Sequence, residues 1–270
     1  MSDISDISAL KDPAKLRRFA TIRAVAALVL REMSTSYGRS PIGYLWEIIQ
    51  PVGGIALLTA VFSVMLSAPP IGKSFVLFYS TGILPFLMYQ TVNAKVAQSI
   101  QFSRQLLIYP SVTVFDALAA RFLLNYMTQV LVCFVLFTGI MMVQETRTSI
   151  DLWAILLSFA MAGALAFGVG VINSFLFGML PVWFRLWTVL NRPLFLVSGA
   201  LFLFEDIPEP YRSYVWYNPI THIIGQMRHG FFSYYEASYV SPIYVFSVSL
   251  TMCVVGFLFL KRYALNILND

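Results

Sequence analysis

Six apolar runs divide the chain, and each is long enough to form a helix that crosses a membrane. They cover residues 43–67, 75–96, 122–143, 152–180, 183–204 and 242–260. About 20 predominantly apolar residues cross the roughly 30 Å of hydrocarbon in a bilayer. The pattern therefore predicts an all-α integral membrane protein with six transmembrane helices. We expect residues 43–262 to form the transmembrane domain, between a cytoplasmic N-terminal segment (1–42) and a cytoplasmic tail (263–270).

The segment before the first run has the pattern of an amphipathic helix. Asp12 and Pro13 resemble a helix start, with an N-cap followed by proline. A core helix of a soluble protein would look similar, but the adjacent apolar run favours a helix in the membrane interface, ending near Gly38 and Pro41. Its apolar face comprises Phe19, Ile22, Ala26, Val29, Leu30 and Met33, and its opposite face Arg17, Thr21, Ala24, Arg31 and Glu32.

Composition supports the membrane assignment. Apolar residues make up 59% of the chain and charged residues 11%, whereas soluble domains carry about 25% charged residues. Both cysteines, Cys133 and Cys253, lie in apolar runs, so we expect inert thiols and no disulfide. The polar N-terminus lacks the apolar centre of a signal peptide.

The positions of the basic residues predict the orientation. If the N-terminus is cytoplasmic, 14 of the 18 lysines and arginines lie on the inner side. The remaining four are Lys73, Arg147, Arg212 and Arg228. Because cytoplasmic loops carry the excess of Lys and Arg, both termini are expected in the cytoplasm.

One long segment, 205–241, then lies on the outer side. It is too polar to span, so we expect short re-entrant helices that pack on protein in the outer leaflet. The spacing of His222, His229 and Glu236 fits no zinc motif, which favours a hydrogen-bonding role over a metal site. The candidate residues of an outer gate are Tyr211, Tyr214, Trp216, Tyr217, His222 and Arg228.

The longest inner loop, 97–116, contains a short amphipathic piece over residues 102–109 that Pro110 ends. An isolated helix of this kind can dock a cytoplasmic partner, and a plain interfacial loop is the alternative. The candidate coupling residues are Phe102, Arg104, Leu106, Leu107, Ile108, Tyr109 and Pro110.

Ionisable residues in or near the spans point to a substrate path, because such groups are costly in lipid and usually face a cavity or a partner. Arg185 and Arg192 are seven positions apart and share a helix face, with Arg192 about 10 Å deeper. Snorkelling explains Arg185 more easily than Arg192, and pairing with Glu47 is a second account of Arg192. Arginine forks bind carboxylate or phosphate, and aromatic rings stack on sugars. The candidate path residues are Trp46, Glu47, Lys95, Arg185, Trp187 and Arg192.

The fourth run carries small residues at every fourth position, which allow close helix packing within a subunit or across a dimer. The main row is Ala162, Ala166, Gly170, Ser174 and Gly178, and a second row is Ala160, Ala164 and Gly168.

No motif for catalysis or ATP binding is convincing. Residues 72–74, Gly-Lys-Ser, imitate the end of a phosphate-binding loop, but Ser67 stands where that motif needs glycine. We therefore expect no cofactor on this chain, and any ATPase to be a separate subunit.

Three ordered motifs resemble the permease subunit of bacterial ABC exporters for capsular polysaccharide, in the family that also exports O-antigen and teichoic-acid polymers. The first is Arg31, Glu32, Thr35, Tyr37, Gly38, Gly43, Tyr44, Leu45, Trp46 and Pro51, with Ser36 where the family usually has arginine. The second is Tyr109, Pro110, Phe115, Asp116, Ala117 and Arg121. The third is Tyr217, Asn218, Pro219, Ile220, Thr221, His222, Arg228 and Phe231.

The resemblance implies an exporter of two permease copies and two ATPase subunits in the bacterial inner membrane. ATP and Mg²⁺ would bind the ATPase subunits, and the substrate would be a lipid-linked polysaccharide rather than a nucleic acid. Capsule systems add a periplasmic adaptor of the co-polymerase type and an outer-membrane channel. The short loops favour the capsule branch. An O-antigen or teichoic-acid exporter is the alternative within transport, and a membrane enzyme acting on lipid-linked sugars is the alternative outside it.

Overall fold

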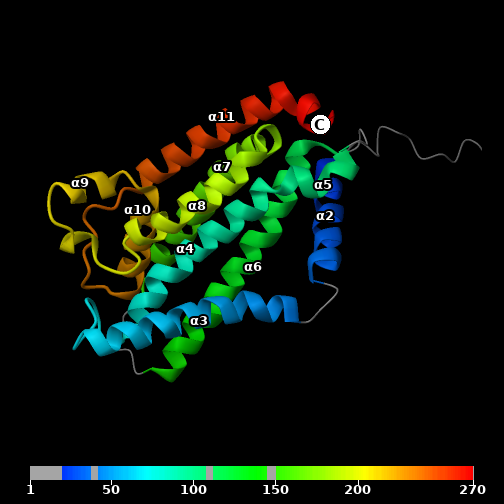
Figure 1. Cartoon of the computed structure of the whole chain (residues 1–270). Helices are drawn as coiled ribbons and strands as arrows, with labels where there is room; N and C mark the ends of the chain where they lie inside the picture. Colours follow the sequence, from blue (N-terminus) through cyan, green and yellow to red (C-terminus); the bar gives the residue numbers. More distant parts are fainter. Residues whose placement is uncertain (1–19, 38–41, 108–111, 145–149, 270) are drawn as a thin grey trace, which may run out of the picture.

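The computed structural model describes residues 20–37, 42–107, 112–144 and 150–269, which are helical with short connections and contain no strand. The all-α prediction is confirmed (Figure 1). The elements are α2 (Ala20–Glu32), the π-helical turn η2 (Met33–Tyr37), α3 (Ile42–Met65), α4 (Phe75–Ala97), α5 (Ser99–Leu107), α6 (Val114–Val143), α7 (Leu152–Met179), α8 (Pro181–Val197), the 3-10 turn η3 (Phe204–Asp206), α9 (Tyr211–Trp216), α10 (Pro219–Phe231) and α11 (Pro242–Asn269). The predicted helix start at Asp12 and Pro13 lies outside the described residues.

Five described helices, α3, α4 with α5, α6, α7 and α11, are long and apolar enough to cross a membrane. The predicted fifth span differs, because α8 has 17 residues and ends at Val197. Ser198 caps it, and Gly199 then takes a positive φ of 76° that turns the chain. The sixth crossing therefore stays a prediction.

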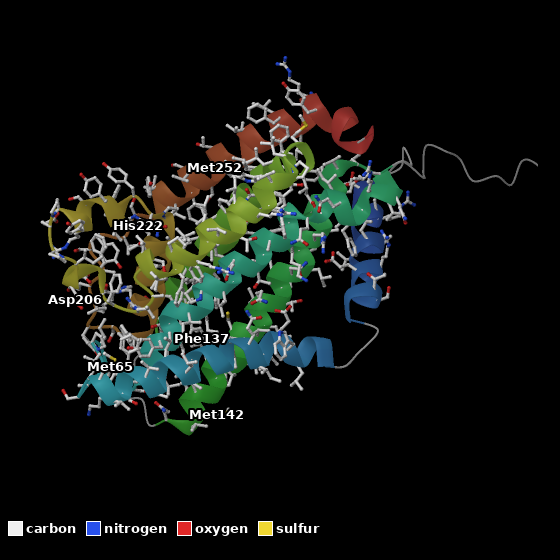
Figure 2. The ribbon with its side chains drawn as sticks, in the orientation of Figure 1. Met65, Phe137, Met142, Asp206, His222 and Met252 are labelled. Atoms are coloured by element: carbon white, nitrogen blue, oxygen red, sulfur yellow. The ribbon has the colours of Figure 1, made fainter. Side chains whose placement is uncertain are left out.

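The helices alternate between two ends of the molecule. We call one the α5 end, where α2 and α5 meet the start of α6. The other is the α10 end, where Ser74 bonds Gln144 and the Asp151 amide donates to the Gly230 carbonyl. Met65 and Met142, late in α3 and α6, lie in the lower part of Figure 2, and Asp206 and His222 lie at its left, all away from α2 and α5. α8 begins at the α5 end and leads to Ala200, which is packed on Gly82 of α4.

α7 lies at the centre and packs on α4, α10 and α11 (Figure 1). Its small residues allow this packing: a Cβ on Gly170 would come within 2.7 Å of Val96, and one on Gly168 within 2.4 Å of the Ser249 carbonyl oxygen. The predicted small-residue rows thus bring α4 and α11 against α7 inside one chain.

Part of the apolar face of α2 is exposed. Ile22 is 63% exposed and Leu30 67%, whereas Glu32 on the predicted polar face is 2% exposed. Glu32 therefore binds protein, and the location of α2 in the membrane interface stays a prediction.

Side-chain caps define the helix starts. Thr113 and Asp116 form a capping box, so α6 begins eight residues before its apolar run. Ser74 caps α4, and Gly72 has a φ of 81° against Phe232. These contacts give the Gly-Lys-Ser sequence a structural role in a turn. Cys133 and Cys253 are free thiols.

Candidate functional site

An open groove of about 460 Å³ lies between α3, α4 and α8. Its walls are mainly apolar, and four residues bring long polar side chains to it from three helices. These are Gln50 of α3, Gln90 of α4, and Asn191 and Arg192 of α8. A groove that combines one cation, three amides and apolar surface suits a ligand with both sugar-like and anionic groups.

A small polar pocket between α3, α4 and α6 lies beside the groove, since Gln50 and Leu87 line both. The Gln129 amide donates a 2.8 Å hydrogen bond to Glu47 there. Gln129 is 6% exposed, so this bond satisfies polar groups inside the bundle. Within the described part of the chain, Glu47 and Arg192 form no ion pair.

The predicted path residues occupy different environments. Arg192 lines the groove, and Glu47 lines the small pocket beside it. Arg185 is exposed on α8 and lines neither, and Trp187 stacks on Trp183 with ring centroids 6.3 Å apart. Trp46 is 60% exposed, and Lys95 is partly buried near the end of α4. The sequence reasoning missed Gln90 and Gln129, whose signal is an amide within an apolar run.

One side of the groove is open. Asn191 is the only buried residue of α8, and α3 exposes large apolar side chains along its length. Cβ atoms on Gly53 and Gly54 of α3 would meet nothing within 4 Å. Exposed glycines next to apolar residues let another helix approach closely in lipid.

A second open space, a cleft of about 430 Å³, lies at the α5 end. It separates the first turns of α5 from the turn between α7 and α8. Its lining residues are Gln98, Ile100, Gln101, Arg104, Phe177, Gly178, Pro181 and Phe184. A partner that filled this cleft would touch both α5 and the first turn of α8.

Arg121 of α6 holds α2 and α5 together beside this cleft. Its Nε donates to Glu32 Oε1 at 3.0 Å, and its Nη1 donates to the Gln98 carbonyl at 3.2 Å. The guanidinium also lies 4.2 Å from the ring centroid of Phe102. Asn125 donates a further bond to Glu32 Oε1 at 3.3 Å. The sequence reasoning did not predict this cluster, since its members are far apart in the chain.

The predicted coupling residues belong to α5 only in part. Ser99, Ile100 and Ser103 face the protein, whereas Arg104 is exposed and Phe102 lies under the guanidinium of Arg121. Leu106 and Leu107 are partly buried. Ile108, Tyr109 and Pro110 lie outside the described residues.

The predicted outer segment, 205–241, contains exposed aromatic residues and buried polar ones. Tyr211, Tyr214 and Tyr217 are 65–73% exposed. His222 is buried: the Ser241 amide donates to its Nδ1 at 3.1 Å, so Nε2 carries the hydrogen and donates to the Trp216 carbonyl at 2.8 Å. Burial lowers the pKa of this imidazole, and the bond to Trp216 opposes that shift.

Arg228 is also buried, at 1% exposure. It donates to the carbonyls of Phe202 at 2.8 Å and Ala200 at 3.1 Å, and its guanidinium lies 4.5 Å from the ring centroid of Phe78. It therefore fixes the turn after α8 against α4 and α10. Of the predicted gate residues, only the three tyrosines present an exposed surface.

Comparison with known proteins identifies the family of the chain. A family model described as "ABC-2 type transporter" matches residues 23–232. The polysialic acid transport protein KpsM of Escherichia coli is 27% identical over 232 residues, which are 86% of this chain and 90% of that protein. The capsule polysaccharide export inner-membrane protein CtrC of Neisseria meningitidis is 25% identical over 243 residues, 90% of this chain and 91% of that protein.

A third relative, the capsule polysaccharide export inner-membrane protein BexB of Haemophilus influenzae, is 23% identical over 242 residues. This match covers 90% of the present chain and 91% of BexB. The family model alone spans well over half of the chain, and these relatives align along nearly all of it. The protein therefore belongs to the ABC-2 type transporter family.

Proposed function

We propose that this chain is the permease subunit of an ATP-driven exporter that moves a lipid-linked, anionic capsular polysaccharide across the bacterial inner membrane. The observation that carries the proposal is the groove between α3, α4 and α8 in a chain of this family, since its polar residues match such a polymer. The names of KpsM, CtrC and BexB, which refer to polysialic acid transport and capsule polysaccharide export, favour a capsular substrate.

The polymer slides along the groove held by several weak contacts. Arg192 pairs with carboxylate or phosphate groups of the polymer. The amides of Gln50, Gln90 and Asn191 bond its hydroxyl groups, and apolar walls such as Phe195 contact sugar ring faces. Contacts of this kind are individually modest, so the polymer is retained without being trapped.

A second copy of the chain closes the groove. The open side, the exposed apolar face of α3 and the uncovered Gly53 and Gly54 support a helix–helix contact there. Two copies arranged about a two-fold axis would enclose one path between their grooves.

Two ATPase subunits, which carry the ATP and Mg²⁺, dock at the α5 end. The cleft between α5 and the α7–α8 turn supports this assignment, since it offers a partner both polar and apolar contacts. The α5 end and both termini are then cytoplasmic, as the distribution of Lys and Arg predicts. The α10 end faces the periplasm, where a co-polymerase-type adaptor leads to the outer-membrane channel.

Deleting the gene in the parent bacterium tests the function. We expect capsular polymer to disappear from the surface and to accumulate, still attached to its lipid, inside the cell, and a plasmid copy to restore export. Accumulation of O-antigen or teichoic acid with a normal capsule would instead assign the chain to the other branch. Loss of polymer synthesis without accumulation would indicate an enzyme on lipid-linked sugars and would overturn the proposal.

A further inference from the structure

α8 is held to the rest of the molecule by few contacts, although it carries Arg192. Most of its side chains are exposed, and Asn191 is its only buried residue. At its start Phe184 packs edge-on against Phe177 of α7, with ring centroids 5.3 Å apart. Towards its end Phe195 packs on Phe86 of α4, at 5.0 Å. Ring contacts of this kind permit small rotations, so they do not set the direction of α8 by themselves.

One directional bond does tie α8 to the bundle. The indole N–H of Trp183 donates a 3.0 Å hydrogen bond to Oδ1 of Asn173 on α7. The amide nitrogen of Asn173 in turn donates to Oδ1 of Asn93 on α4, at 3.4 Å. The two asparagines are 1% and 0% exposed. A chain of two hydrogen bonds therefore joins α8, α7 and α4 inside the protein.

The asparagine pair lies where α4 and α7 are in close contact. A Cβ on Gly170 would come within 2.7 Å of Val96 and 3.3 Å of the Asn93 carbonyl oxygen, so the two backbones approach each other closely there. The Nδ2 of Asn93 is nevertheless buried without a partner. An unsatisfied buried donor is costly, and two apolar residues would avoid that cost. The two asparagine amides therefore support the bond to Trp183 more than they contribute to the free energy of unfolding.

Because Trp183 lies at the start of α8, its bond to Asn173 affects the position of the whole helix. α8 starts with Pro181 directly after Leu180, whose backbone is extended, so the α7–α8 turn does not continue a helix. Trp183 is in the first turn of α8, and Arg192 lies nine residues further, about 13 Å along the axis. A small rotation at Trp183 displaces Arg192 by a larger distance. α4 leads into α5 through Gln98, so a displacement of α5 reaches Trp183 through Asn93 and Asn173.

We propose that Trp183 is a positioning residue: its bond to Asn173 sets the direction of α8, and so places Arg192 in the groove and transmits movement of α4 and α5 to α8. The role in export rests on the proposed function. The effect of the bond on the position of α8 does not rest on the proposed function. Export and helix position can therefore be measured separately.

The test is Trp183→Phe, which keeps an aromatic ring and removes the N–H donor. The matched control is Trp153→Phe, at a side chain that is 82% exposed at the start of α7. Spin labels at the exposed Val189 of α8 and Val254 of α11 report the position of α8 in the purified complex in nanodiscs. We expect Trp183→Phe to broaden or shift the distance distribution and to lower export about fivefold, the loss expected for one neutral hydrogen bond. Basal ATP hydrolysis should persist, and Trp153→Phe should match the wild type.

A second variant, Asn173→Ser, removes the acceptor without adding volume and keeps the proposal testable if Trp183→Phe folds poorly. If loss of this bond causes the defect, the variant with both substitutions shows no larger change in label distance or export than either single variant. An unchanged label distance in both single variants would overturn the proposal, as would additive effects. If the complex exports no polymer at all, the proposed function fails, and the label distances still decide the role of Trp183.

Discussion

Glu32 and Arg121 form a buried ion pair with a 3.0 Å separation between Oε1 and Nε. The pair joins α2 to α6, and Arg121 extends it to α5 through the Gln98 carbonyl and the ring of Phe102. These contacts link the three helices at the α5 end. A force on α5 would therefore reach α2 through Arg121.

Removing one partner of this pair should destabilise the protein. Glu32→Ala leaves the Arg121 charge buried without its carboxylate, which costs about 3–5 kcal/mol of the unfolding free energy. Glu32→Gln should cost less because its amide oxygen still accepts a bond. Thermal unfolding in detergent measures both. The exposed Asp206 provides the control, since Asp206→Ala should stay within about 0.5 kcal/mol of the wild type; an equally small effect of Glu32→Ala would contradict the prediction.

Two glycine-to-alanine changes should have opposite effects. In Gly168→Ala the new Cβ would lie 2.4 Å from the backbone oxygen of Ser249, so α7 and α11 must separate, at a cost of about 1–3 kcal/mol. In Gly139→Ala the Cβ meets nothing within 4 Å, and helix propensity should stabilise α6 by about 0.5–1 kcal/mol. Melting temperatures compared side by side test this; a stabilising Gly168→Ala would show that the helices are not closely packed there.

Arg192 should act on the polymer and not through Glu47. Arg192→Gln should lower export about tenfold or more, the loss expected for a charge-assisted hydrogen bond, with Arg192→Lys between Gln and the wild type. Because Glu47 is bonded to Gln129, the exchange Glu47→Arg with Arg192→Glu should stay inactive. Capsule on the cell surface is the readout, with membrane levels of the protein as the control. Restored export in the exchange variant would favour pairing between the two residues, and full activity of Arg192→Ala would refute both roles.

Coupling to the ATPase should depend on the exposed face of α5. Arg104→Glu reverses a charge that lines the cleft, so we expect lower export and weaker co-purification of the ATPase while the permease still inserts. Lys261→Glu makes the same charge change on α11, away from the cleft, and should be neutral. Normal export and normal ATPase recovery with Arg104→Glu would refute docking at this face.

The stability of the outer segment should fall in acid. Burial keeps the pKa of His222 below its usual 6.5, so the folded protein binds this proton less readily than the unfolded chain. The contribution of neutral His222 is complete above pH 6.5 and is lost as pH falls through its folded pKa. The melting temperature should therefore drop between pH 7 and pH 5. The drop in melting temperature should be smaller in His222→Gln than in the wild type. It should be unchanged in His229→Gln, which keeps His222. Equal drops in the wild type and both variants would contradict the prediction.

The apolar runs identified the helices because length and hydrophobicity are local properties. They failed at the end of the fifth run, where residues 198–203 are apolar but turn back into the protein. Ala200 is fully buried there, and its carbonyl accepts a bond from Arg228. Apolar side chains alone do not tell whether a segment faces lipid or the core.

The candidate site was less predictable, because its polar contacts join distant parts of the chain. Arg192 could be proposed from its cost in a membrane, but its neighbour Gln90 could not. Glu32 was assigned to the polar face of α2, yet its partner Arg121 follows 89 residues later. Periodicity predicts which face is polar and does not predict what that face will bind.

The sequence separation of the two buried arginines has a consequence for biogenesis. Arg228 binds carbonyls made 26 and 28 residues earlier, so its ligands have already left the ribosome when it emerges. Glu32 is in the opposite situation, because its partner follows 89 residues later. At about 5–20 residues per second, α2 waits roughly 4–18 s for Arg121. During that interval Glu32 lacks its arginine partner, and a targeting factor or a chaperone can still bind α2.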